Sequence, residues 1–269
     1  AIGFTIMGVL EAVHSPVTSP GVWVPIVAGI ASGAAFVVAE RHVRAPLIPQ
    51  GFFAEPVRRA SNVLAAFGMA VFTSYPFTMT LYAQNVLGYT PLDVGLMMLP
   101  LVGSLGLGLL IGARVLRTRT LKEVAMVTGL VSGAGLLWTS LIQTDSTYFA
   151  DILPGMALFG LAIGLAMPML TNGSLYGTTP GNSSLASAIQ TAAQQAGGAI
   201  GLAVLAATAT AVTVRLLDGG TSVPAAATAG YVVALRIGAG LSLASTLVAA
   251  LILPAVRASD SDATAGVQP

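Results

Sequence analysis

The sequence predicts an all-α, polytopic membrane protein with about eight transmembrane helices. Its mean hydropathy is +0.86 and only 8% of its 269 residues are charged, whereas about a quarter of the residues are charged in soluble domains. The apolar residues occur in long blocks separated by short polar or proline-containing joints. A membrane-spanning helix needs about 20 mainly apolar residues, so each long block is a candidate span.

Two helices are expected in residues 1–44 and six in residues 61–257. The first segment is shorter than a full span and has no charged leader, so we expect a helix truncated at its start rather than a signal peptide. The eight apolar segments are 1–13, 22–40, 61–87, 91–113, 122–142, 149–172, 184–214 and 229–254.

Two further segments complete the predicted organisation. In residues 45–60 Phe52 and Phe53 precede Arg58 and Arg59, which favours an amphipathic linker lying on the cytoplasmic membrane surface. Residues 258–269 are polar and small, and we expect a disordered cytoplasmic tail there.

The basic residues predict the orientation in the membrane. Nine of them fall in joints on one side, against Arg215 alone on the other, and Arg236 lies within a predicted helix. Because cytoplasmic loops are enriched in Lys and Arg, the expected location is the cell membrane with both termini cytoplasmic. The nine residues are Arg41, Arg44, Arg58, Arg59, Arg114, Arg117, Arg119, Lys122 and Arg257.

The composition argues against an enzyme, a metalloprotein and a nucleic-acid-binding protein. There is no cysteine, and His14 and His42 have no Ser or Asp partner at an informative spacing. No phosphate-binding loop, HExxH or paired-carboxylate motif is present, so no catalytic residue, metal ligand or cofactor is expected. No basic run supports binding to nucleic acid.

A polar and aromatic stripe in segment 61–87 is the first candidate binding surface. Tyr75, Thr78, Tyr82 and Asn85 follow one another at steps of three, four and three, so they share one helix face. Such a face suits a hydrophobic small molecule that carries a few hydrogen-bonding groups. The alternative is that the stripe packs against a neighbouring helix.

Segment 149–172 carries small residues at helical spacing. Gly160, Gly164 and Pro168 recur at steps of four. The two glycines form a GxxxG contact face, and the proline frees a backbone carbonyl and favours a bend. We therefore expect a helix-packing or gating role for these three positions.

Segment 184–214 has one unusual face. The part of this face nearer the cytoplasm carries glutamines, and the part further along the helix carries glycines. All of these residues lie within an arc of about 120°. This face either lines a wet cavity or meets another helix closely. The candidate ligand-binding residues are Gln190 and Gln194, and the candidate packing residues are Gly197, Gly198 and Gly201.

Four stretches resemble the fourteen-helix drug:proton antiporter branch of the major facilitator superfamily. They are similar to the branch's cytoplasmic linker, its helix–turn–helix element, its glycine-rich helix ending in an apolar residue and proline, and its glutamine and double-glycine helix. The stretches are APLIPQGFFAEPVRRASN (45–62), LYAQNVLGYTPLDVGLMMLP (81–100), LPGMALFGLAIGLAMPMLTN (153–172) and ASAIQTAAQQAGGAIGLAVL (186–205).

The resemblance implies two linking helices followed by a six-helix C-terminal bundle. It implies proton-coupled export of hydrophobic molecules by alternating access, with a six-helix N-terminal half as the missing partner. Loop 112–124 resembles the family's G-x-x-x-D-R-x-G motif only in part, because Leu116 replaces the acid and Arg119 the glycine. We expect the 197–201 glycines to pack on that missing half and the glutamines to line the cavity between the halves.

Two alternatives to a transporter remain at this stage. The chain could be a truncated or partner-dependent membrane fragment without transport activity, since a single bundle has no opposing bundle to close a cavity. An intramembrane enzyme would need a catalytic dyad at matched depth, and the sequence offers none.

Overall fold

The computed structural model describes residues 24, 27–28, 31–32, 52–179 and 181–257, and every regular element among them is a helix. The predicted helices at 1–13 and 22–40, residues 45–51 of the linker and the tail 258–269 fall wholly or largely outside the described residues. In the part that is described, six helices are long and apolar enough to cross a membrane. These six correspond to the six segments predicted between residues 61 and 257.

The helices follow one another through short connections. Two of the membrane-length spans are composite, since α4 continues into α5 and η2 into α7. The elements are η1 (Phe52–Ala54), α3 (Pro56–Asn85), α4 (Pro91–Met97), α5 (Leu99–Val115), α6 (Leu121–Thr139), η2 (Tyr148–Ile152), α7 (Leu153–Leu175), α8 (Ser183–Asp218) and α9 (Val223–Ile252).

Local capping explains where several helices begin. Thr90 and Asp93 form a capping box at the start of α4, and Thr120 and Glu123 form another at the start of α6. Each box satisfies backbone N–H groups that have no partner within the helix. Helix α3 begins at Pro56, five residues before the predicted start, because Glu55 accepts a hydrogen bond from the Val57 amide and proline favours a first helical position.

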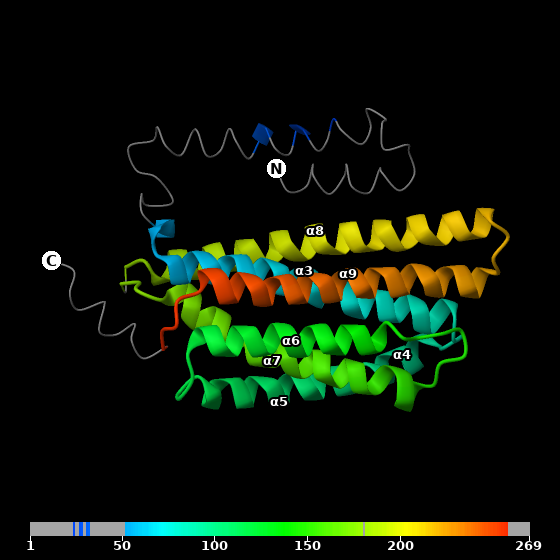
Figure 1. Cartoon of the computed structure of the whole chain (residues 1–269), viewed down its shortest axis with the longest axis horizontal. Helices are drawn as coiled ribbons and strands as arrows, with labels where there is room; N and C mark the ends of the chain where they lie inside the picture. Colours follow the sequence, from blue (N-terminus) through cyan, green and yellow to red (C-terminus); the bar gives the residue numbers. More distant parts are fainter. Residues whose placement is uncertain (1–23, 25–26, 29–30, 33–51, 180, 258–269) are drawn as a thin grey trace.

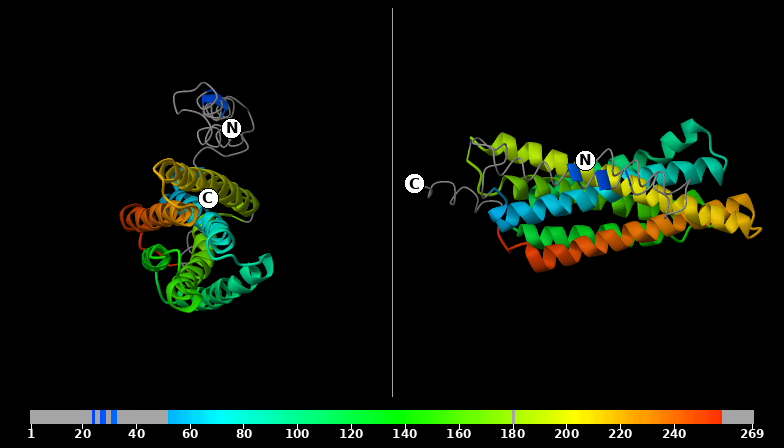
Figure 2. Two further views of the ribbon diagram at one scale, coloured as in Figure 1. Left: turned by 90° about the vertical axis from the view of Figure 1, so that its right-hand side faces the viewer. Right: turned by 90° about the horizontal axis from the view of Figure 1, so that it is seen from above.

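The six spans pack in two layers around α3 and α7 (Figures 1 and 2). One layer has the order α5, α7, α3, α8, in which each helix packs on the next. Behind it, α6 packs on α7 and α9, and α9 also packs on α3 and α8. Because α6 and α9 cover one side of α3 and α7, the opposite side of the four-helix layer carries no further helix of the described bundle.

Two clusters of buried side chains form the core, one toward each end of the helices. One includes Tyr75, Tyr82 and Phe159. The other includes Leu121 and Met169, near the arginine-bearing α5–α6 loop. We call the bundle end that holds this loop, the start of α3 and the end of α9 the basic end.

Candidate functional site

The aromatic stripe of α3 points into the bundle. Tyr75 and Tyr82 are almost completely buried, at 1% and 0% exposure, and Thr78 is also buried. The Tyr75 hydroxyl lies 3.3 Å from the Thr139 hydroxyl of α6, and its ring packs 4.5 Å from the ring of Phe159 of α7. The Tyr82 hydroxyl donates to the carbonyl of Gln143 after α6. The two tyrosines therefore contact α6, α7 and the connection after α6, and Thr78 is also enclosed within the bundle.

Asn85, the last residue of the stripe, differs from the other three. Its side chain is exposed at the end of α3, and its amide Nδ2 lies 3.2 Å from the Tyr231 hydroxyl of α9. The structure thus brings the four residues onto one helix face, as the spacing predicts, but only Asn85 lies open. A ligand-binding role for the stripe stays a prediction.

The two candidate glutamines of α8 differ in burial. Gln190 is buried, and its side-chain oxygen accepts a hydrogen bond of 2.7 Å from the Ser174 hydroxyl of α7. Gln194, one turn further along the helix, is half-buried. A buried amide is tolerated in an apolar setting when it has a hydrogen-bond partner, and Ser174 supplies one for Gln190.

The glycine face of α8 packs on α3, which corrects the expectation that it packs on a missing N-terminal half. A Cβ added to Gly197 or Gly201 would overlap the backbone of Ala66 or Ala70, and one added to Gly198 would lie 2.9 Å from the Thr73 hydroxyl. The physical reason is that glycine lets two helix backbones approach within one bundle just as it does between bundles. Sequence spacing alone does not distinguish these two partners.

The small residues of α7 pack against α5. A Cβ on Gly160 would overlap the backbone of Leu101 and the Ser104 side chain, and one on Gly164 would overlap the Leu105 carbonyl. On α5, a Cβ added to Gly112 would lie 3.0 Å from the ring of Pro168. Gly160, Gly164 and Pro168 thus form part of one close helix–helix contact.

A short polar segment follows Pro168 toward the basic end of α7. The Thr171 hydroxyl donates to the Met167 carbonyl and the Asn172 amide donates to the Pro168 carbonyl. Both side chains are exposed. Together with Gln190, they give the basic half of the bundle a group of polar side chains on α7 and α8.

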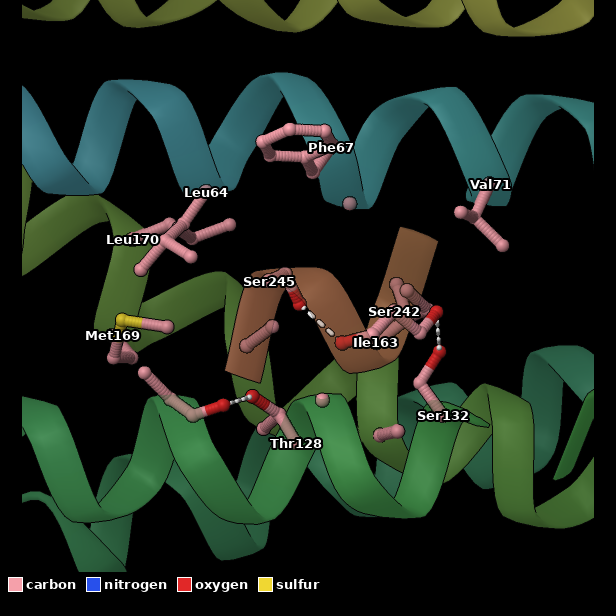
Figure 3. A pocket seen from close by; sticks show the side chains of 15 residues that line it. Leu64, Phe67, Val71, Thr128, Ser132, Ile163, Met169, Leu170, Ser242 and Ser245 are labelled. Carbon is pink, nitrogen blue, oxygen red and sulfur yellow. Dashed lines mark hydrogen bonds between the residues drawn. The ribbon is translucent and has the colours of Figure 1, made fainter. Parts of the chain in front are cut away.

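A small cavity lies between α3, α6, α7 and α9 (Figure 3). Its volume is about 40 Å³, which is enough for an ordered water molecule. The hydroxyls of Ser132 and Ser242 lie 3.0 Å apart at its edge, and Thr128 and Ser245 donate to carbonyls of their own helices. The cavity is too small for a drug-sized ligand.

Arg58 is buried at the basic end, whereas the sequence predicts it on the membrane surface. Arg58 is only 7% exposed. It donates to the Phe52 carbonyl at 2.8 Å and to the Tyr176 carbonyl at 2.9 Å, and its guanidinium lies 4.5 Å from the centre of the Phe52 ring. Arg58 therefore ties η1 and the start of α3 to the α7–α8 connection, whereas its neighbour Arg59 is exposed.

The architecture and the relatives agree on one family. The sequence profile of the Major Facilitator Superfamily matches residues 1–202, three quarters of the chain. The chain belongs to the major facilitator superfamily. This is a family of transporters, so the expectation that the chain is not an enzyme is confirmed. Among the described residues, no three His, Asp or Glu side chains gather in a group that could hold a metal ion.

Resistance and export proteins of this superfamily are similar to the chain. The puromycin resistance protein pur8 of Streptomyces alboniger is 31% identical over 91% of the chain and 50% of its own length. The cephamycin export protein CmcT of Amycolatopsis lactamdurans is 30% identical over 91% and 49%, and the multidrug efflux pump LfrA of Mycolicibacterium smegmatis is 30% identical over 66% and 35%. The resemblance to the drug-efflux branch is confirmed, and the chain spans at most about half the length of these relatives.

Proposed function

We propose that the chain is the C-terminal part of a proton-coupled multidrug-type efflux permease that works by alternating access. The proposal rests on the similarity of 91% of the chain to a puromycin resistance protein and a cephamycin export protein. The two-layer bundle supports it, because one side of the α5, α7, α3, α8 layer is free to face a second bundle across a central cavity. The basic end is cytoplasmic in this proposal.

The proposed transport route follows the uncovered side of that layer. We assign ligand contact first to Gln194, which is half-buried and shares its helix face with the Ser174-bonded Gln190. The exposed Asn172 of α7 supplies a further polar group toward the basic end of the route. Asn85 is exposed but bonds to Tyr231 of α9 on the covered side of the layer, so in this proposal it reaches a ligand only together with the rest of the stripe. Tyr75, Thr78 and Tyr82 reach a ligand in this proposal only if α3 rotates during the transport cycle.

A second bundle completes the proposed cavity. Since the relatives are about twice as long as the chain, we assign proton coupling and the opposing wall to a six-helix N-terminal half. A fragment without transport activity is the competing candidate. The two candidate functions predict different behaviour in a cell: a permease exports the drug, and a fragment without transport activity does not.

Drug tolerance of a susceptible bacterium tests the proposal. Expression of the intact protein is expected to raise the inhibitory concentration of puromycin, lincomycin or a cephamycin by several-fold. The Gln194→Ala variant should transport about tenfold less efficiently, since a buried hydrogen bond to a ligand contributes about 1.5 kcal/mol. Gln195→Ala is the matched control, because this neighbouring glutamine is exposed and lies about 100° around the helix. Unchanged tolerance to all three drugs with a well-inserted protein would contradict the proposal, and equal effects of the two variants would contradict the site.

A further inference from the structure

An apolar groove separate from the proposed route runs between α5 and α6. Its volume is about 510 Å³, within the range of about 300–1,000 Å³ that small-molecule sites occupy. Five of its lining residues are aliphatic: Ile111, Val115, Val124, Val127 and Leu165. Thr128 completes the wall, and Arg119 and Glu123 stand at the end of the groove that meets the α5–α6 loop.

The groove exists because α5 and α6 pack on α7 and have at most a marginal contact with each other. Glycines bring each helix close to α7. A Cβ on Gly108 of α5 would overlap the Leu161 carbonyl, and one on Gly135 of α6 would lie 2.7 Å from the Gly155 carbonyl. Leu165 of α7 therefore forms the floor of the groove, between the two flanking helices.

The groove opens toward the hydrocarbon of the bilayer. Ile111 and Val127, on its two walls, are 36% and 52% exposed, and both lie on membrane-length helices. Exposed aliphatic side chains on such helices contact lipid chains rather than water. An acyl chain that lies in the groove would contact aliphatic side chains of three helices at once.

The charges at the mouth of the groove favour an anionic headgroup. Four basic residues lie within ten positions, and the exposed guanidinium of Arg119 is in the groove lining itself. The acid of this segment is Glu123, whose carboxylate accepts a hydrogen bond of 3.2 Å from the Thr120 amide. The segment 114–123 therefore carries a net charge of +3. Its basic residues are Arg114, Arg117, Arg119 and Lys122.

We propose that this groove is a binding site for an anionic phospholipid, with one acyl chain between α5 and α6 and the phosphate held by Arg119. The apolar groove ends at the basic α5–α6 loop, just as the acyl chains of a lipid end at its headgroup. A lipid whose chain lies in the groove therefore has its phosphate beside the basic residues. A zwitterionic lipid of the same chain length fills the apolar part equally well but gains less from the positive loop.

Lipid retention by the intact protein tests this site. The protein, purified in detergent and mixed with equal amounts of phosphatidylglycerol and phosphatidylcholine of identical chains, is expected to retain phosphatidylglycerol preferentially in native mass spectrometry. Arg119→Gln should weaken phosphatidylglycerol binding by about fivefold, the effect of one basic side chain near a membrane surface. Val127→Trp should block the groove and lower retention of both lipids.

Two matched variants serve as controls. Arg215→Gln removes an exposed arginine at the far end of α8, and Leu247→Trp adds the same bulk to an exposed position of α9. Both are expected to retain lipid as the unmodified protein does. Equal retention of the two lipids by the unmodified protein, or an Arg119→Gln effect no larger than that of Arg215→Gln, would overturn the proposal. Neither outcome depends on whether the protein exports drugs.

Discussion

Replacing Gly164 with alanine is expected to lower the free energy of unfolding of the bundle by about 1–3 kcal/mol, the usual cost of overpacking a tight contact. The added Cβ would overlap the Leu105 carbonyl and lie 2.7 Å from the Leu109 amide nitrogen of α5. Both atoms belong to a helix backbone, so neither can move without displacing α5. Thermal unfolding of the purified protein in detergent measures the effect.

Gly103→Ala is the matched control for this change. Gly103 is exposed on α5, and a Cβ there would have no atom within 4 Å. The same substitution should therefore be neutral or stabilise the helix by up to about 1 kcal/mol, since alanine favours helix more than glycine does. If Gly164→Ala and Gly103→Ala unfold at the same temperature, the close α5–α7 contact is not as described.

Replacing Arg58 with methionine is expected to destabilise the protein by about 3 kcal/mol or more. The substitution keeps an unbranched apolar stem but removes the donors to the Phe52 and Tyr176 carbonyls. Hydrogen bonds from a charged donor contribute about 1.5–3 kcal/mol each, and the buried acceptors would lose their partners. The readout is the thermal midpoint, together with proteolysis of the α7–α8 connection, which should become faster.

Arg59→Met provides the comparison, because Arg59 is the next residue of the same helix and is exposed. Its loss should change stability by less than about 0.5 kcal/mol, as is usual for surface positions. A similar loss of stability in both variants would mean that general charge at this end of α3, rather than the buried contacts of Arg58, accounts for the effect.

Much of the fold can be predicted from hydropathy, because each span must be apolar over about 20 residues. Each of the six described spans overlaps one predicted segment. The largest differences are at helix starts. Helix α9 begins at Val223 rather than at residue 229. The small residues before position 229 are helical, but they are too weakly apolar to be counted in the hydrophobic segment.

The direction in which each face points could not be predicted, because periodicity defines a face but not its neighbour. For the stripe that contains Tyr75, the sequence leaves open a ligand-binding face or a helix contact, and for the glycine face that contains Gly198 it predicts a contact with a second half. Both pack inside the described bundle. Arg58 is predicted on the membrane surface because a charge beside aromatic residues favours an interface. Its partner Tyr176 lies 118 residues further along the chain, so the sequence around Arg58 does not reveal that contact.

Drug transport by the intact protein in proteoliposomes tests the central claim most directly. With an imposed proton gradient, we expect puromycin or another drug that the cells tolerate to move across the membrane against its own gradient. We expect this movement to stop when the proton gradient is collapsed and to fall about tenfold in Gln194→Ala but not in Gln195→Ala. Gradient-independent leakage, or no movement by a correctly inserted protein, would contradict the assignment to a proton-coupled efflux permease.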